Sequence, residues 1–301
     1  MRIDERLARA NGEPSFSFEF FPPKTEEGEH NLERALEALS RMEPTFVSVT
    51  YGAGGSPVQK RKTIEIVSRI KADHGLEAMA HFTCVGATVG ELRATLDVMR
   101  DAGVENVLAL RGDPPAGQEE WTATEGGLSY SRELIEMIRT DYEFAIGAAC
   151  FPEVHIHAES AESDLRYCKE KVDAGARFLI TQLFFDNASY WDFVARAREI
   201  GIDVPIIPGI MPITNVDQIK RFTSMCGATI PAGLLHELQA RAEQPDAVTD
   251  FGVAYATLQC ADLLEHGAPG IHFYTLNKSP ATRAILSALR CMAPWRDAVP
   301  V

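Results

Sequence analysis

The stretch Ser17-Phe18-Glu19-Phe20-Phe21-Pro22-Pro23 places one carboxylate in a run of aromatic residues and ends that run with two prolines. Side chains alternate between the two faces of a β-strand, so Phe18 and Phe20 share one face while Ser17 and Glu19 share the other. Proline has no N–H group for a ladder hydrogen bond, which ends regular pairing at this point. The stretch therefore predicts a strand with Glu19 as its last polar side chain.

Glu19 has two interpretations at this point. A carboxyl group beside aromatic surface is desolvated, which favours its protonated form and makes it a candidate proton donor. Alternatively, Glu19 is a solvated residue at a strand end, or the partner of a lysine or arginine in a structural ion pair. The stretch alone leaves both interpretations open, and the rest of the chain has to decide between them.

Short apolar runs like this one recur along the chain, each followed by a segment with helical periodicity. The predicted strands are 15–20, 46–51, 77–83, 104–110, 144–150, 177–183, 203–210 and 270–275. The predicted helices are 28–42, 58–74, 88–102, 128–140, 158–174, 188–200, 215–226 and 279–291, with an extra helical stretch at 231–266. Such alternation indicates parallel βαβ units, and eight units close into a (β/α)₈ TIM barrel.

We therefore predict an α/β protein whose residues 15–301 form a single catalytic (β/α)₈ barrel, preceded by an N-terminal lead-in at 1–14. The alternative is an open, doubly wound sheet. It is disfavoured because no G-x-G-x-x-G motif follows the first strand, and Gly52-Ala53-Gly54-Gly55 has the wrong spacing and follows the second.

Composition excludes several classes of function. The 301 residues include 29 basic and 43 acidic side chains, and the formal charge of −14 argues against broad binding to nucleic acid or to anionic membranes. No apolar run has the length of a membrane span, and the first residues contain no secretory signal. The six cysteines show neither a C-x-x-C pair nor a metal-ligand spacing, which predicts a reduced, cytoplasmic protein without a metal site. A homo-oligomer is compatible with these features.

Polar residues follow nearly every predicted strand, at the end of a barrel where active sites lie. The strand ends carry Glu19, Thr50, Tyr51, His81, Thr83, Arg111, Gly112, Asp113, the segment Phe151-Pro152-Glu153-Val154-His155, Gln182 and the segment 275–278, most of which are polar. Alternation predicts inward-facing pairs at Ser48 and Thr50, His81 and Thr83, Ala109 and Arg111, and Ile180 and Gln182. Each residue alone has an ordinary structural explanation, but their convergence at one rim predicts a functional pocket.

The residue types in this pocket suggest its chemistry. Histidine, arginine, lysine and backbone amides at strand ends suit an anionic, phosphate-bearing cofactor or substrate. Glu19 and Asp113 supply two carboxylates for acid–base work or for stabilising a cation. The sequence contains no nucleophile elbow, H-E-x-x-H motif or P-loop. The residues themselves thus predict a barrel enzyme with a large site of mixed charge.

At these positions the chain resembles the bacterial type of the 5,10-methylenetetrahydrofolate reductase family, catalytic barrel only. The matching blocks, in order over about residues 15–280, are SFEFFPPKT, FVSVTYGAGGS, HFTCVG, LALRGDPP, FPEVH, KVDAGARFLITQLFFD, IIPGIMPITN and HFYTLNKS. The resemblance implies a (β/α)₈ barrel with non-covalent FAD. It also implies that NADH or NADPH reduces the flavin and leaves before the folate substrate enters the same face.

The resemblance further implies roles for individual residues. Glu19 would be the general acid that protonates folate N10 and opens the five-membered ring to a 5-iminium cation, and Asp113 would stabilise that cation beside the flavin. The cofactor contacts implied are Thr50, Tyr51, Ala53, His81, Arg111, Gly112, Asp113, Tyr130, Ser131, Phe151, His155, Ala158, Asp164 and Lys171. The substrate contacts implied are Asp113, Gln182, Gln218, Phe222 and Lys278.

Some positions depart from the family pattern. Phe151 stands where a tyrosine is frequent, Lys278 replaces a usual arginine, and Tyr167 and Glu170 stand where other polar or basic residues are common. These departures keep two alternatives open. One is direct hydride transfer from NADH to the folate without a flavin, and the other is a folate-binding barrel without catalysis.

Overall fold

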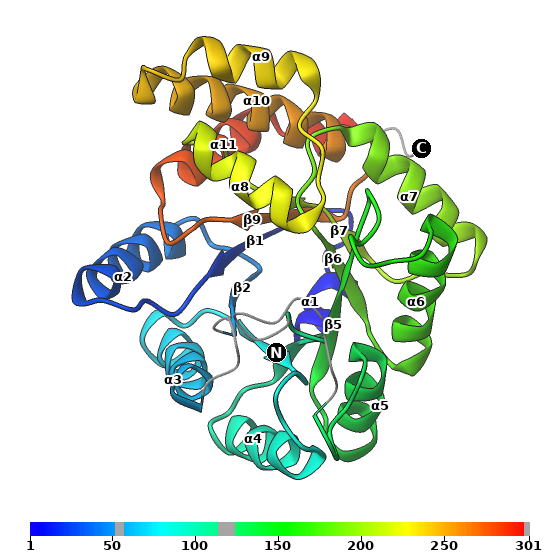
Figure 1. Cartoon of the computed structure of the whole chain (residues 1–301). Coiled ribbons are helices and arrows are strands. Elements are labelled where there is room, and N and C mark those ends of the chain that lie inside the picture. Colours follow the sequence, from blue (N-terminus) through cyan, green and yellow to red (C-terminus); the bar gives the residue numbers. More distant parts are fainter. Residues whose placement is uncertain (52–56, 114–123, 298–301) are drawn as a thin grey trace.

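The computed structural model of the chain describes residues 1–51, 57–113 and 124–297, and the described part forms a sheet of nine parallel strands inside a ring of helices (Figure 1). The strands are β1 Ser15–Phe20, β2 Phe46–Val49, β3 Ala78–Thr83, β4 Asn106–Leu110, β5 Ala145–Cys150, β6 Phe178–Thr181, β7 Ile206–Ile207, β8 Gly209–Ile210 and β9 Gly270–Tyr274. Their order is β7-β6-β5-β4-β3-β2-β1-β9-β8, which confirms the predicted barrel.

One predicted strand, 203–210, is two short strands in the structure. β7 pairs with β6, whereas β8 pairs with β9 on the other side. Pro208 separates them because it has no N–H group to donate, while its carbonyl accepts a hydrogen bond of 2.9 Å from the backbone N–H of His272. The two ends of the sheet are thus joined through one residue, and the barrel closes there.

The helices follow the predicted alternation with small shifts at their ends. They are α1 Ile3–Ala8, α2 Glu26–Ser40, α3 Pro57–His74, α4 Val89–Asp101, α5 Ser131–Asp141, α6 Ala161–Ala174, α7 Asn187–Glu199, α8 Val216–Cys226, α9 Ala232–Ala240, α10 Pro245–Glu265, α11 Pro280–Met292 and the 3₁₀ helix η1 Pro294–Asp297. The single stretch predicted at 231–266 is two helices, since α9 ends before Pro245 begins α10.

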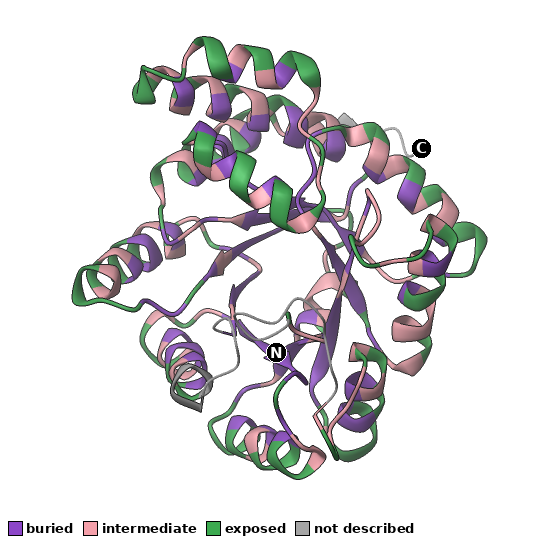
Figure 2. Ribbon diagram, in the orientation of Figure 1, coloured by how far each residue is buried: buried purple, intermediate pink, exposed green. Residues whose placement is uncertain are grey.

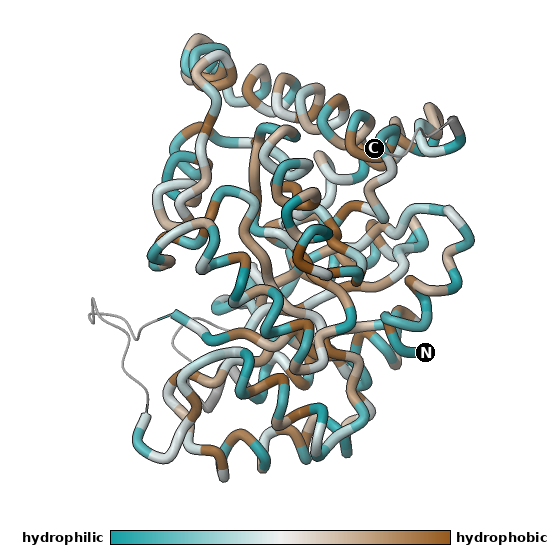
Figure 3. The backbone as a smooth tube through the Cα atoms, turned by 90° about the vertical axis from the view of Figure 1, so that its right-hand side faces the viewer, coloured by the Kyte–Doolittle hydropathy of each residue, from teal (hydrophilic) through white to brown (hydrophobic). Residues whose placement is uncertain are grey.

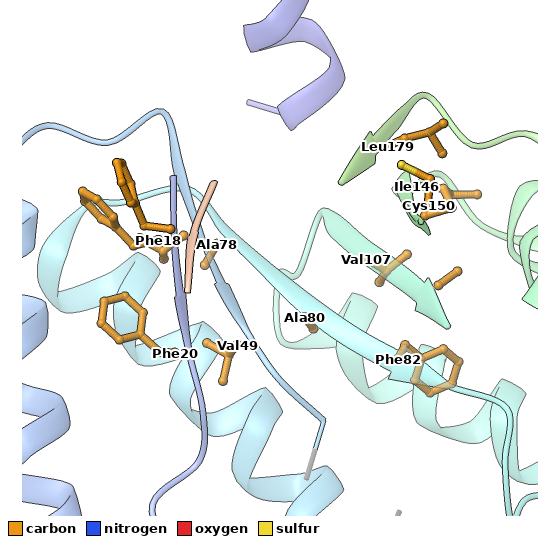
Figure 4. Close-up of a cluster of buried hydrophobic side chains, with 14 of the residues drawn as sticks. Phe18, Phe20, Val49, Ala78, Ala80, Phe82, Val107, Ile146, Cys150 and Leu179 are labelled. Carbon is orange, nitrogen blue, oxygen red and sulfur yellow. The ribbon is translucent and has the colours of Figure 1, made fainter. Parts of the chain in front are cut away.

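Alternation along the strands divides the core into two layers. Phe16, Phe18 and Phe20 point outward into the large apolar cluster beneath the helices, as Figure 4 shows for Phe18 and Phe20. A separate cluster fills the lumen, with Phe46, Met79, Leu108, Phe178, Ile180 and Ile207 among its members. The predicted inward position of Ala109 is wrong: Ala109 belongs to the outer cluster, and its neighbour Leu108 faces the lumen.

Helix α1 closes the barrel at the amino-terminal ends of the strands. Ile3 is fully buried in the lumen cluster, and its backbone N–H donates a hydrogen bond of 2.7 Å to Oδ1 of Asn106, the first residue of β4. The lumen is therefore closed on this side, and ligands must enter at the opposite rim.

Burial and hydropathy follow the same layers. Figure 2 shows buried strands surrounded by helices with exposed outer faces, and Figure 3 shows hydrophobic segments running through the interior. Among the described residues, no helix combines the length and the apolarity needed to cross a bilayer.

Gly252 offers a test of how tightly α10 is packed. A Cβ atom at this position would lie 1.9 Å from the backbone carbonyl oxygen of Ile213, which cannot rotate away. We expect Gly252→Ala to lower the free energy of unfolding by about 1–3 kcal/mol, measured by urea denaturation. Gly233 in α9 is the matched control, because a Cβ there meets nothing within 4 Å. Gly233→Ala should be neutral or stabilising by up to about 1 kcal/mol, and equal losses in both variants would contradict the packing argument.

Candidate active site

The carboxylate of Glu19 lies in the lumen near the carboxyl ends of the strands, between two imidazoles. Its Oε2 atom is 3.4 Å from Nε2 of His81 on β3 and 3.6 Å from Nε2 of His272 on β9. The Glu19 side chain is 20% exposed, whereas those of His81 and His272 are 8% and 0% exposed. Glu19 is thus a partly accessible acid beside two buried histidines, and no lysine or arginine of the described residues pairs with it.

Several buried polar atoms of β2, β3 and β9 lack a hydrogen-bond partner among the described residues. They are Oγ of Ser48, Nε2 of His81, Oγ1 of Thr83 and Nε2 of His272. Buried polar groups are normally satisfied, so unpaired ones call for a functional or ligand-related explanation. Burial lowers the pKa of His81, although the nearby Glu19 carboxylate opposes this effect, and His81 is therefore a neutral imidazole at neutral pH.

The backbone around Glu19 is held by the segment that follows β9. The hydroxyl of Thr275 donates a 2.6 Å hydrogen bond to the carbonyl oxygen of Glu19. The side-chain amide of Asn277 accepts from the N–H of Phe21 at 3.0 Å and donates to its carbonyl at 2.8 Å. Leu276 and Asn277 both have positive φ angles, of 52° and 55°, a conformation that is costly away from glycine and concentrates at functional sites.

A second polar cluster follows β5. Oδ2 of Asp164 accepts a 3.1 Å hydrogen bond from the backbone N–H of His155, and Ala158 donates its N–H to the carbonyl of His155 at 2.8 Å. Nζ of Lys171 donates to the carbonyl of Ala149 at 2.5 Å and lies 5.9 Å from the centre of the Phe151 ring. Five predicted cofactor residues are therefore brought together, namely Phe151, His155, Ala158, Asp164 and Lys171.

His155 has an unusual electrostatic environment. Its pKa falls to about 4, first because of burial and then because of the positive charges of Arg111, His157 and Lys171, while Asp113 acts in the opposite direction. Nδ1 of His155 also accepts a hydrogen bond of 3.1 Å from the N–H of His157, which occupies the lone pair that a proton would need. The cations Arg111, after β4, and Lys171, on α6, thus both act on this part of the rim, where Asp113 acts in the opposite direction.

The turn after β4 requires glycine at position 112. Gly112 has a φ of +92°, and a Cβ atom there would lie 2.4 Å from Cγ1 of Val85. Its carbonyl accepts a hydrogen bond of 3.4 Å from Nε of Arg111, while Asp113 is exposed. The turn thus presents one cation and one carboxylate next to each other at the rim.

The remaining predicted cofactor residues lie on neighbouring elements. Thr50 donates its N–H to the carbonyl of Phe20 at 2.8 Å, which ties β2 to the end of β1. Tyr51 is buried edge-on against Phe82, and burial raises the pKa of its phenol. Tyr130 and Ser131 lie at the start of α5, where Glu133 accepts the N–H of Tyr130 at 3.1 Å. Ala53 lies outside the described residues.

The predicted substrate residues are arranged more loosely. Gln182 follows β6, and its Oε1 accepts the N–H of Leu183 at 2.9 Å. Gln218 and Phe222 are one turn apart on α8, and Lys278 is exposed after β9. Among the described residues, no hydrogen bond or ion pair joins these four side chains to Glu19. Sequence reasoning also missed His272, although its parity with Tyr274 on a strand beside β1 would have indicated the lumen.

Comparison with known proteins identifies the family. A family model described as methylenetetrahydrofolate reductase matches residues 2–290. The chain belongs to this family. The resemblance noted from the sequence motifs is thereby confirmed.

Two kinds of relative are similar to the chain. The 5,10-methylenetetrahydrofolate reductase of Escherichia coli is 39% identical, over 95% of this chain and 94% of the bacterial one. Methylenetetrahydrofolate reductase (NADH) 1 of Arabidopsis thaliana is 41% identical, over 95% of this chain and 51% of the plant protein. The chain thus spans about half the length of the plant relative.

Among solved structures, the fold is similar to that of an uncharacterized protein from Clostridium thermocellum, which binds two copies of 5-methyl-5,6,7,8-tetrahydrofolic acid. The TM-score is 0.60 over 96% of this chain and 98% of the other, with 16% sequence identity. At this identity the likeness concerns the fold alone.

The lowered pKa of His155 predicts a pH dependence of stability. The folded-state pKa of about 4 lies below the ordinary value of 6.5, so between these values the unfolded chain binds a proton that the folded chain does not. This contribution to stability is present above pH 6.5 and is lost as the pH falls towards 4. We expect His155→Gln to reduce the loss of stability over this range, measured by urea unfolding at several pH values. His236→Gln, at an exposed histidine of α9, is the control, and parallel curves for wild type and His155→Gln would refute the assignment.

Proposed function

We propose that this protein reduces 5,10-methylenetetrahydrofolate to 5-methyltetrahydrofolate with NADH or NADPH, by ping-pong kinetics through non-covalently bound FAD. The observation that carries the proposal is the Glu19 carboxyl group, which lies at the carboxyl ends of the strands against two buried imidazoles. Membership of the family and the names of the bacterial and plant relatives support the reaction. The folate bound by the structural neighbour from C. thermocellum suits a folate substrate on this fold.

The residues present fit FAD by the chemistry of their donors. Arg111 and Lys171 act together on His155, and a concentration of positive charge suits the pyrophosphate of a dinucleotide. Nε2 of His81 and Oγ1 of Thr83, which have no partner within the described ranges, offer further polar contacts at the same rim. We propose that FAD is held by Thr50, Tyr51, Ala53, His81, Arg111, Gly112, Asp113, Tyr130, Ser131, Phe151, His155, Ala158, Asp164 and Lys171. The chemistry that FAD would supply is the storage of a hydride between two substrates.

The acid–base work falls to two carboxyl groups of this chain. Glu19 protonates N10 of the folate, and the bond between N10 and the bridging carbon breaks, which leaves a cationic 5-iminium group on the substrate. Asp113 stabilises that cation electrostatically from the turn after β4. Addition of a hydride to the exocyclic methylene then gives the 5-methyl product. Gln182, Gln218, Phe222 and Lys278 orient the folate, and Lys278 offers a cation to the glutamate tail of the substrate.

Two alternative functions stay open because Phe151 and Lys278 depart from the family's sequence pattern. In the first, NADH transfers its hydride directly to the folate, which requires a ternary complex, whereas the flavin route requires a modified enzyme between two half-reactions. In the second, the barrel binds folate without catalysis. The presence of both Glu19 and Asp113 favours a catalyst over a silent binding protein.

We further propose that residues 15–301 are the catalytic barrel and that 1–14 are a lead-in whose helix α1 covers the barrel base. We infer a cytoplasmic location. The six cysteines support it, because all of them are free thiols. A homo-oligomer remains part of the proposal.

The first test is the visible spectrum and kinetics of the purified protein. We expect a yellow preparation that consumes NADH and converts methylenetetrahydrofolate to the 5-methyl product with parallel-line initial-rate patterns. Converging lines from a colourless protein that FAD does not activate would replace the flavin route with direct transfer. Folate binding without turnover would support the silent barrel.

Glu19→Gln separates the two halves of the reaction. The amide cannot protonate N10, so folate reduction should fall by about 100-fold or more, while reduction of the flavin by NADH should remain close to the wild-type rate. Stopped-flow absorbance measures both steps separately. Equal losses in both steps would mean that Glu19 has a structural role.

A further inference from the structure

His272 is a buried histidine to which the proposed reaction gives no role. Its side chain is 0% exposed, and its Nδ1 lies 2.8 Å from the hydroxyl of Ser17. Its Nε2 has no hydrogen-bond partner in the described part of the chain and lies 3.6 Å from Oε2 of Glu19. In ligand-free active sites such contacts are often long and tighten only when substrate binds.

The hydrogen bond with Ser17 decides which ring nitrogen carries the proton. If the Ser17 hydroxyl donates to Nδ1, the proton of the ring is on Nε2 and faces the Glu19 carboxylate as a donor. In the opposite arrangement, the lone pair of Nε2 would face the carboxylate oxygen and the Ser17 proton would have no acceptor among the described side chains. The first arrangement gives a hydrogen-bonding role to the Ser17 hydroxyl, the His272 imidazole and the Glu19 carboxylate together.

The orientation of the His272 ring is held by its neighbours. It is stacked on Phe46, with ring centres 6.0 Å apart and an angle of 18°, and it meets Tyr274 edge-on at 5.5 Å. Tyr274 is in turn anchored by its hydroxyl, which donates a 2.6 Å hydrogen bond to the carbonyl of Thr181. The imidazole therefore cannot rotate away from Glu19 without repacking the lumen.

The closest approach of both imidazoles is to the same carboxylate oxygen, Oε2. We propose that His272 is a positioning residue for Glu19: Ser17 selects its Nε2–H tautomer, and this N–H holds Oε2 so that Oε1 is directed to the substrate. His81 contributes to the same contact but also borders the proposed cofactor site. This inference rests on the proposed function for its catalytic consequence, and on geometry alone for the tautomer.

Nitrogen NMR of protein with labelled histidine tests the tautomer without any turnover. We expect the His272 resonances, identified by their loss in His272→Gln, to show a protonated Nε2 and an unprotonated Nδ1. Glu19→Gln should move the Nε2–H signal, and Ser17→Ala should allow both tautomers. A protonated Nδ1 in the wild type, or signals indifferent to both variants, would overturn the proposal.

Two substitutions of similar size separate positioning from packing. The amide nitrogen of His272→Gln can take the place of Nε2 beside Glu19, whereas that of His272→Asn reaches only the Ser17 side. We expect His272→Asn to lower kcat for folate reduction about 100-fold with little change in KM, and His272→Gln to retain at least about ten times more activity. Equal losses in the two variants would indicate packing alone. His266→Gln, at an exposed histidine paired with Asp262, is the control.

A double-mutant cycle links the effect to Glu19. In a Glu19→Gln background, His272→Asn should cause no further loss of kcat, because there is no acid left to position. A full additional loss would overturn the proposal. If the His272 variants fail to fold by thermal melting, Ser17→Ala removes only one hydroxyl group and should still lower kcat about tenfold. A wild type without folate reduction would refute the proposed function, while the NMR experiment would still decide the tautomer.

Discussion

Alternation along β1 is the constraint on which the rest of the site depends. Three phenylalanines on one face are buried under the helices, so the other face, with Ser17 and Glu19, must point into the lumen. A slip of one residue would place the Glu19 carboxylate in the outer apolar layer and turn aromatic rings towards the histidines. The position of the acid is thus enforced by the burial of Phe16, Phe18 and Phe20 on the opposite face of the strand.

The lumen changes from apolar to polar along the barrel axis. Phe46, Met79, Leu108 and Phe178 fill its lower part, and Ile3 from α1 adds to them from below. Glu19 and the two imidazoles lie above this layer. Water therefore reaches the acid only from the rim, and a bound ligand there would complete its desolvation. The degree to which the Glu19 carboxyl group is desolvated therefore depends both on the protein and on the bound ligand.

Much of the fold could be predicted from the sequence because strand and helix periods alternate so regularly. The split at 203–210 could not, since a proline in a short apolar run also fits an unbroken edge strand. The inward position predicted for Ala109 was wrong because the phase of a strand is set by its register with neighbours, here Ala109 with Phe82. The rim residues were predictable as strand ends. His272 does not lie at a strand end, so only its parity with Tyr274 indicated an inward position, and parity alone does not separate a site histidine from a packed one.

The clamp between Asn277 and Phe21 replaces the ladder with a side chain where the strands have already ended. Further backbone pairing would have extended the sheet beyond β1 and β9. Instead, the one side-chain amide of Asn277 satisfies both backbone polar groups of Phe21, and the segments after the two strands can diverge.

The seam at Pro208 has a consequence for the motions of the barrel. β7 and β8 have two residues each. The pairings of β6 with β7 and of β8 with β9 are therefore much shorter than the pairing of β3 with β4. Local opening costs least where a ladder is shortest, and amide protons along this seam should exchange with solvent before those of the other strands. The barrel is closed, but its strand pairing is weakest between Thr181 and His272, which is the side next to Glu19.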